Sequence, residues 1–214
     1  MSKPDKALMS VTFKPSPSFW RNQLRQWHWI SSALCLVGMI LFSVTGFTLN
    51  HAAQIEAKPT LISWEKDLTD TTIALLPKAG DKTPVPADLA AAIKADTGVD
   101  IAKISPEVSD SDIYFAMPGP GFDEWLNIER DTGYATYEKS HRGVIAVLND
   151  LHKGRNAGPA WGWFIDIIAI ASVIFCLTGL GLLWIYARGR KITWPLIGLG
   201  TIVPFILFLL FIHS

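Results

Sequence analysis

The stretch "WFIDIIAIASVIFCLTGLGLLWIY", residues 163–186, is long and apolar enough to cross a lipid bilayer as one helix. A helix needs roughly 20 apolar residues to span a hydrocarbon core of about 30 Å. Residues 29–49 and 194–212 meet the same requirement. The composition agrees, because 50% of the 214 residues are hydrophobic and only 18% are charged. The sequence therefore predicts three membrane-spanning helices.

Basic residues gather next to these spans at two places, before the first span and between the second and the third. They are Lys14, Arg21, Arg25, Arg188, Arg190 and Lys191. Because basic residues beside membrane helices favour the cytoplasmic side, both places are predicted to be cytoplasmic. Lys153 and Arg155 count weakly against this topology. The prediction is a protein of the bacterial inner membrane, with a cytoplasmic N-terminus and its main domain in the periplasm.

The predicted fold class is membrane α-helical, with a small α+β extracytoplasmic domain between the first and second helices. The first span is not expected to be a cleaved signal peptide, because it is long and no A-x-A-like site follows it. The predicted divisions are a cytoplasmic segment at 1–27, a helix at 28–50, the periplasmic domain at 51–140, an amphipathic interfacial segment at 141–160, a helix at 161–187, a cytoplasmic turn at 188–193 and a helix at 194–214.

Within the domain, "TLISWE" predicts a first strand and "ADLAAAIKADTG" predicts a helix that ends in glycine. Alternating apolar residues then predict strands in "DIAKISPEV", "DIYFAMPG", "EWLNIER" and "YATYEKS", with "DTG" at 131–133 forming the last hairpin turn. The acidic residues of the domain are scattered, so no catalytic residue is expected there.

Three short motifs, "VTGFTLNH", "DLHKGR" and "LTGLGLLW", accompany this single α+β unit between helices. Together they resemble the small three-helix type of PepSY-associated transmembrane protein, over nearly the whole chain after residue 20. The resemblance implies a PepSY-like domain. It also implies a haem-bearing electron-transfer protein of the minimal ferric-reductase-like type, linked to iron uptake.

Independently of that resemblance, four of the five histidines lie at predicted membrane boundaries or lead to one: His28, His51, His152 and His213. A haem with two imidazole ligands needs an apolar slot, small residues near the ring and cations for its propionates. His51 and His152 are both predicted on the outer side and are the candidate axial ligands. No CxxCH motif is present, so the predicted haem b is held non-covalently.

Other residues are candidates for the surroundings of this haem. Thr45 and Gly46 would form the slot or serve close helix packing, as would the Thr-Gly pair at 178–179. Lys153 and Arg155 would contact haem propionates or an anionic acceptor, and lipid phosphates are an equal alternative.

His28 precedes His51 by 23 residues, about 35 Å of helix, so one haem cannot use both. A second copy of His28 would complete an inner haem, which predicts a homodimer. Residues 141–152, "HRGVIAVLNDLH", predict an amphipathic helix on the membrane surface. His141 would then lie about 16 Å from His152 along this helix. It would either pair with the sheet or replace His152 as a ligand.

Asp166 lies inside the second span, where a carboxylate is costly without a partner or water, and Arg155 or a histidine is its expected partner. A competing interpretation is a membrane-anchored binding or regulatory module without redox activity. A transporter subunit fits less well, because three helices with one acid lack the broken helices of such sites.

These observations predict a homodimeric b-type cytochrome that reduces ferric iron or a ferric siderophore at the periplasmic face. A cytoplasmic flavin or quinol would be the reductant, since the chain has no flavin or nicotinamide fingerprint. Membrane lipid is the expected surrounding. The net charge of zero gives no reason to expect a nucleic acid partner.

Overall fold

The computed structural model describes residues 16–55, 58–77 and 85–211. Lys14 and His213, named above, lie outside these ranges. The chain forms two compact units, with boundaries between residues 39 and 40 and between residues 165 and 166. Helices α1 (Pro17–Asn50) and α5 (Gly158–Tyr186) contribute residues to both units.

Three helices of the described chain are long and apolar enough to cross a membrane, as predicted. They are α1, α5 and α6 (Thr193–Phe211). Large apolar side chains are exposed along all three, as expected for contact with lipid. α1 begins earlier than predicted, and α5 begins at Gly158 with Pro159 in its first turn, where a missing N–H costs nothing.

Between α1 and α5 in the sequence lies a five-stranded antiparallel sheet with the order β1-β5-β4-β3-β2. Its strands are β1 (Thr60–Asp67), β2 (Glu107–Val108), β3 (Asp112–Ala116), β4 (Phe122–Glu129) and β5 (Tyr134–His141). The predicted "DTG" turn joins β4 to β5. Gly133 adopts a φ of 72° there, and its N–H donates to the Glu129 carbonyl at 2.9 Å.

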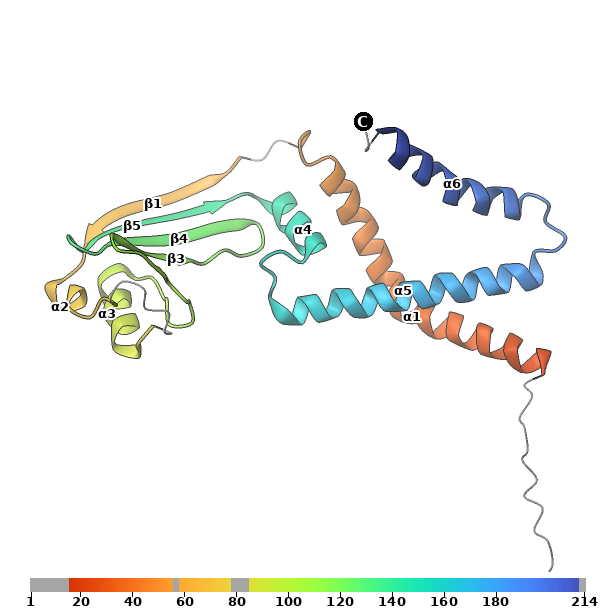
Figure 1. Ribbon diagram of the computed structural model, residues 1–214, viewed down its shortest axis with the longest axis horizontal. Helices are drawn as coiled ribbons and strands as arrows, with labels where there is room; N and C mark the ends of the chain where they lie inside the picture. Colours follow the sequence, from red (N-terminus) through yellow and green to blue (C-terminus); the bar gives the residue numbers. More distant parts are fainter. Residues whose placement is uncertain (1–15, 56–57, 78–84, 212–214) are drawn as a thin grey trace, which may run out of the picture. The chain divides into compact units, whose positions relative to one another are not determined.

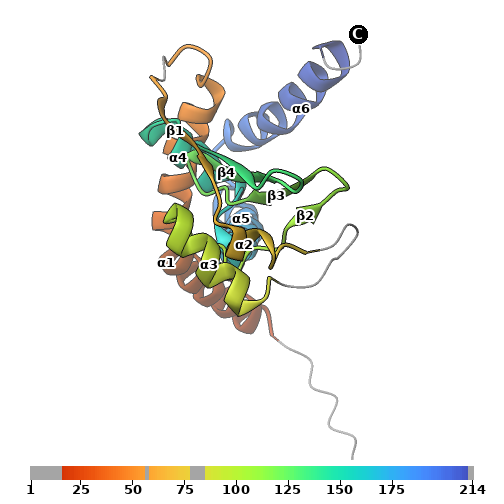
Figure 2. The same ribbon diagram turned by 90° about the vertical axis from the view of Figure 1, so that its left-hand side faces the viewer.

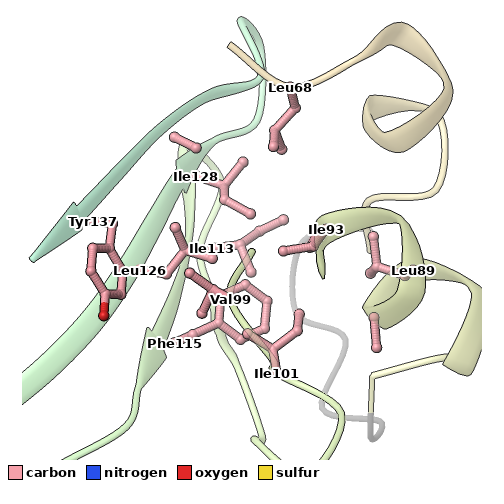
Figure 3. Packing of buried hydrophobic residues seen from close by; sticks show 12 residues of the cluster. Leu68, Leu89, Ile93, Val99, Ile101, Ile113, Phe115, Leu126, Ile128 and Tyr137 are labelled. Atoms are coloured by element: carbon pink, nitrogen blue, oxygen red, sulfur yellow. The ribbon is translucent and has the colours of Figure 1, made fainter. Parts of the chain in front are cut away.

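One face of the sheet is covered by α2 (Asp70–Ile73) and α3 (Ala87–Thr97), as Figures 1 and 2 show. The hydrophobic core lies between this face of the sheet and the helices (Figure 3), and α3 contributes Leu89 and Ile93 to it. Alternate residues of β3 and β4, among them Phe115 and Leu126, are fully buried. The alternation that predicted these strands thus has its cause in this one-sided burial.

Two sequence predictions are wrong in detail. In "DIAKISPEV" only β2 is a strand, because the Ile104 N–H donates to the Ile101 carbonyl at 3.0 Å and forms a turn. The helix predicted from residue 141 begins instead at Val144, as α4 (Val144–Lys153). Strand β5 extends to His141, and Gly143, with a φ of 84°, separates strand from helix. His141 therefore pairs with the sheet.

Candidate functional site

His152 on α4 packs against one face of α1. Its Nδ1 atom lies 2.8 Å from the Thr45 hydroxyl oxygen. Its Cε1 atom lies 3.2 Å from the position that a Cβ would take at Gly46. The Phe42 ring completes the contact, with centroids 5.3 Å apart and an interplanar angle of 62°. These four residues are called the His152 site. Because Gly46 has no side chain, the imidazole approaches the helix backbone closely.

An equivalent group of residues surrounds His28, where α1 packs against α5. The His28 Nδ1 atom lies 3.1 Å from the Thr178 hydroxyl oxygen and 3.2 Å from the Phe175 carbonyl oxygen. Its Cε1 atom lies 3.3 Å from the Cβ position at Gly179. The imidazole stacks on the Phe175 ring, with centroids 4.6 Å apart. These four residues are called the His28 site.

The two sites share a sequence pattern that is longer than the two Thr-Gly pairs. Residues 41–49 read "LFSVTGFTL", and residues 174–182 read "IFCLTGLGL". Both stretches place phenylalanine three residues before a Thr-Gly pair, as F-x-x-T-G. At 100° per residue these three positions fall within about 100° of one helix face. Aligning the chain with itself would have identified the repeat and the two phenylalanines.

The hydrogen bonds at both sites assign the imidazole proton to Nδ1. Each threonine hydroxyl donates to the carbonyl four residues earlier in its helix, at 2.9 Å for Thr45 and 2.7 Å for Thr178. A hydroxyl has a single hydrogen, so each threonine oxygen accepts from the histidine Nδ1–H. In a neutral imidazole of this tautomer, Nε2 keeps its lone pair and can bind a metal.

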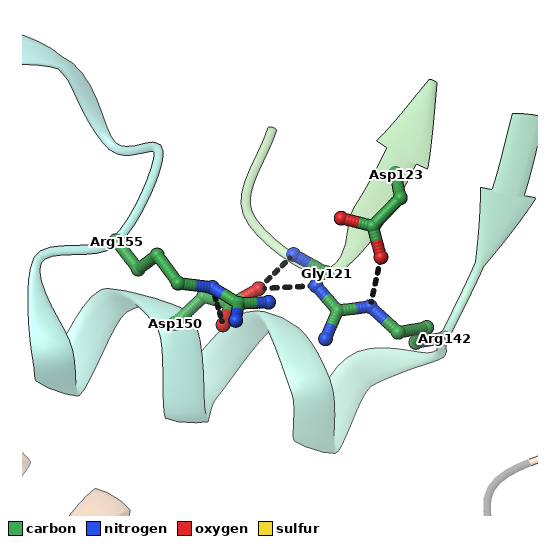
Figure 4. Close-up of polar contacts among 5 residues, drawn as sticks. All are labelled: Gly121, Asp123, Arg142, Asp150 and Arg155. Atoms are coloured by element: carbon green, nitrogen blue, oxygen red, sulfur yellow. Dashed lines mark hydrogen bonds and ion pairs between the residues drawn. The ribbon is translucent and has the colours of Figure 1, made fainter. Parts of the chain in front are cut away.

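α4 is held in place by Asp150, whose carboxylate is buried. Figure 4 shows this carboxylate between two arginines: Oδ2 lies 2.8 Å from Arg142 Nη2, and Oδ1 lies 3.1 Å from Arg155 Nε. The Gly121 N–H also donates to Oδ2 at 2.9 Å, and Arg142 pairs with Asp123 at 3.2 Å. This Asp150 cluster connects α4 to the loop before β4 and to the end of β5. Such pairing is what makes a buried carboxylate tolerable.

The remaining residues of "DLHKGR" continue from this cluster. Gly154 ends α4 in the left-handed conformation, with a φ of 67°. The chain then returns, so that the Arg155 N–H donates to the Asp150 carbonyl at 2.8 Å. The Trp161 indole N–H donates to the Leu151 carbonyl at 2.8 Å and connects the start of α5 to α4. His152 is thus positioned by contacts on both sides of it in the chain.

His51 lies on another face of α1 from the one that contacts His152. Its Nδ1–H donates to the Phe47 carbonyl at 2.9 Å, and its ring centroid lies 4.3 Å from that of Phe47. His51 follows Thr45 by six residues, or about 240° around the helix. No hydrogen bond or ring contact between His51 and His152 is found in the part of the chain that the structure describes. Their pairing stays a prediction.

The other candidate residues lie near the His152 site or in the sheet. Arg155 has Asp150 as an ion-pair partner, and the pairing of Asp166 with Arg155 or a histidine stays a prediction. Lys153 is exposed at the end of α4. His141 is exposed at the end of β5, where its ring centroid lies 5.5 Å from that of Phe122.

A groove of about 830 Å³ lies beside the His28 site. Its lining includes His28 itself, Arg25, Trp29 and Leu182. The groove thus combines apolar side chains with a cation next to an imidazole. Trp29 is 70% exposed, so the groove has an aromatic wall open to its surroundings.

Comparison with known proteins identified a family. A family model described as "Putative PepSY_TM-like" matches residues 19–213. A search of curated proteins and a search of solved structures each found nothing that matches. The matched residues include both histidine sites and the whole sheet.

Proposed function

The chain belongs to the PepSY_TM-like family, and from this membership and its two histidine sites we propose that it is a b-type haem electron-transfer protein. In this proposal it lies in the bacterial inner membrane with a cytoplasmic N-terminus, and the five-stranded unit is a periplasmic PepSY domain. It reduces ferric iron or a ferric siderophore at the periplasmic face and supports iron uptake. A cytoplasmic reduced flavin or quinol supplies one electron for each ferric ion that becomes ferrous.

The observation that supports this proposal most directly is the repeated environment of His28 and His152. Each imidazole donates from Nδ1 to a threonine oxygen, so that Nε2 keeps its lone pair. Histidines that bind metals use the same arrangement, in which a hydrogen bond at one nitrogen orients the other. Simple helix packing does not require the same phenylalanine, threonine and glycine around two histidines.

The residues around both histidines fit a b-type haem. Gly46 in α1 and Gly179 in α5 let an imidazole approach the helix backbone closely, and large apolar side chains are exposed along both helices. Arg25, in the groove beside His28, is a cation suited to a propionate. A bound haem would supply one-electron exchange between ferric and ferrous iron. The protein residues would hold the imidazoles in orientation and limit access of water.

Each site presents one imidazole, whereas a bis-imidazole haem takes two. We propose a homodimer in which a second copy of the chain supplies the missing ligand. The partner subunit's His28 would complete the His28 site, and the partner subunit's His51 would complete the His152 site. This keeps His51 and His152 as axial ligands of one haem, and it accords with their different faces on α1.

Absorption spectra of the purified protein, produced with ample haem, test the proposal. The dithionite-reduced minus oxidised spectrum should show sharp b-type bands. The bands should weaken in His28→Ala, His51→Ala and His152→Ala. His141→Ala is the matched control, because His141 belongs to the sheet and to neither site. A colourless protein, or bands that none of the first three substitutions weakens, would remove the haem from this account.

The reductase activity needs a separate measurement. Cells with and without the protein should differ in the rate at which an extracellular chelator captures ferrous iron. Equal rates would exclude ferric reduction while leaving electron transfer to another acceptor.

A second candidate function, a membrane-anchored PepSY binding module without redox activity, is favoured by strand β1. This strand lies at an edge of the sheet and pairs only with β5 among the described strands. Its apolar residues Leu61 and Ile62 are 57% and 50% exposed. An extended peptide can add to such an edge through backbone hydrogen bonds. Peptide binding by a colourless protein would support this function.

A further inference from the structure

One face of α4 lines a pocket of about 440 Å³, a size that is usual for small-molecule sites. Ile145, Asn149 and Lys153 follow one another along this face at four-residue spacing, and residues just after α1 line the pocket as well. The Thr48 hydroxyl oxygen lies 3.2 Å from the Asn149 side-chain amide, which places this face of α4 next to α1. This cavity is called the α4 pocket.

The α4 pocket has an excess of positive charge. Among the residues that the structure describes, four cations and one carboxylate line it: Lys58, Arg142, Lys153, Arg155 and Asp150. Asp123, outside the lining, also pairs with Arg142. The two arginines share the Asp150 carboxylate and keep further guanidinium N–H groups. The two lysines form no ion pair with any residue that the structure describes. A negatively charged ligand would balance this charge.

Backbone donors at the start of α4 add to the side-chain charge. The pocket lining includes Gly143 and the first three residues of α4, which are Val144, Ile145 and Ala146. No side chain caps this helix, and its first turn has no acidic residue. The first N–H groups of a helix have no acceptor within the helix and attract anions. Cationic side chains and a helix N-terminus therefore indicate the same kind of ligand.

We propose that the α4 pocket binds the ferric acceptor as an anionic chelate that carries carboxylates, such as ferric citrate. This inference rests on the proposed function, because it names the class of acceptor. Apolar lining residues such as Ile55 and Pro59 would contact the carbon skeleton, while the cations and amides bind the carboxylates. Asn149 lies three residues before His152 on α4, so the bound chelate would lie beside the His152 site.

Gallium(III) citrate, which resembles the ferric chelate but is not reduced, provides the test. Its binding to the full chain is measured by calorimetry in phosphatidylcholine nanodiscs. Lys58→Gln and Lys153→Gln should each weaken binding about tenfold, and added salt should weaken binding to the wild type. Lys103→Gln removes an exposed lysine outside the pocket and should bind like the wild type. Absence of binding, or equal affinity in all three variants, would overturn the proposal.

Nanodiscs that contain phosphatidylglycerol distinguish the chelate from a lipid phosphate. If this lipid competes with gallium citrate in the wild type but not in Lys153→Gln, the pocket is a lipid site and the acceptor assignment is wrong. Because the measurement needs no haem, it also separates this proposal from the redox function. Binding by a colourless protein would support an anion pocket and exclude the redox role. A red protein that does not bind gallium citrate would support the redox function and overturn the assignment of the α4 pocket as the acceptor site.

Discussion

The His28 and His152 sites have the same local geometry but depend on different interactions. The threonine oxygens lie 3.1 and 2.8 Å from the histidine Nδ1 atoms, and a glycine lies against each imidazole. His28 belongs to the long helix α1, whereas His152 belongs to α4, a helix of 10 residues. α4 is connected to the sheet by the Asp150 cluster.

This difference shows how one helix pattern can position a histidine by two means. At the His28 site, α1 and α5 approach closely at further glycines: the Ile168 side chain lies 2.8 Å from the Cβ position of Gly38, and the Leu24 side chain lies 3.1 Å from that of Gly181. The cost of disturbing such packing grows gradually with the volume changed. In contrast, when a buried carboxylate is paired with two arginines, removal of one of these charges lowers the folding stability in a single large step.

Removing Asp150 should have the largest effect, and it should act on the His152 site alone. In Asp150→Ala, the buried Gly121 N–H loses its acceptor and Arg142 and Arg155 lose their shared carboxylate, which together costs about 2–4 kcal/mol. Thermal unfolding, followed together with proteolysis between β5 and α5, would measure the change. The control Asp123→Ala removes the exposed partner of Arg142 and should cost under about 1 kcal/mol. Equal effects of both substitutions would mean that the cluster does not hold α4.

Alkaline pH should also distinguish the two units. Burial, together with the hydrogen bond that the Tyr137 hydroxyl donates to Glu124 at 2.9 Å, raises the pKa of Tyr137 to about 12. An unfolded tyrosine titrates near pH 10, so the neutral phenol stabilises the folded sheet below about pH 10. That contribution, roughly 2 kcal/mol, is lost as the pH rises toward 12.

The measurement is denaturation between pH 9 and 12, with circular dichroism for the membrane helices and fluorescence for the sheet. Seven of the nine tryptophans lie in α1, α5 and α6, so the fluorescence is taken from a background in which those seven are replaced by phenylalanine and Trp64 and Trp125 of the sheet are kept. The sheet should lose stability while the helices of the other unit keep theirs. Tyr137→Phe should remove the part of the loss that is due to the phenol. An unchanged pH profile in Tyr137→Phe would show that other groups cause the loss.

Elements with a local cause were predictable from the sequence. The membrane helices follow from continuous hydropathy, and β3 to β5 follow from alternation. The same alternation led to a wrong strand prediction at "DIAKISPEV", where Ile101 lies in a turn and its side chain is nevertheless buried in the core. The predicted helix from His141 failed because Gly143 separates β5 from α4. Whether a glycine interrupts a helix or precedes it depends on pairing with distant strands.

The sequence indicated which histidines are candidate ligands, but it did not indicate which residues contact and position them. Asp150 and Arg142 come together because β5, the loop before β4 and α4 meet in the folded chain. Likewise, Thr45 and His152 contact each other across 107 residues, a relation that a single sequence does not contain. The two Thr-Gly pairs were recognised in the sequence, and the longer F-x-x-T-G repeat would also have identified Phe42 and Phe175.

Replacing the threonines should affect the two sites unequally. Valine keeps the shape of threonine but removes the acceptor oxygen. In Thr45→Val no described residue offers His152 Nδ1 another acceptor, so the site should lose about 1–2 kcal/mol. In Thr178→Val the Phe175 carbonyl still accepts from His28 at 3.2 Å, so the loss should stay under about 1 kcal/mol.

Nitrogen-15 NMR of the imidazoles measures this difference without any cofactor. His152 should become a mixture of tautomers in Thr45→Val, whereas His28 should keep its Nδ1 proton in Thr178→Val. Thr45→Ser restores an oxygen and should restore the single tautomer. If both valine variants respond alike, the Phe175 carbonyl does not share the His28 proton.

Adding a methyl group at the glycines should have the smallest effect, and here the two sites should agree. An alanine Cβ would lie 3.2 Å from His152 at position 46 and 3.3 Å from His28 at position 179. Each ring must therefore shift by a few tenths of an ångström. This cost offsets the gain in helix propensity, roughly 0.5–1 kcal/mol, that alanine brings.

Gly198→Ala in α6 provides the reference, because no atom lies within 4 Å of its Cβ position. Thermal unfolding should show the full gain in Gly198→Ala and almost none in Gly46→Ala and Gly179→Ala. A full gain at either histidine site would mean that its imidazole does not lie against the helix there. Since the two Cβ distances differ so little, unequal results at positions 46 and 179 would show that the repeated pattern does not form two equivalent sites.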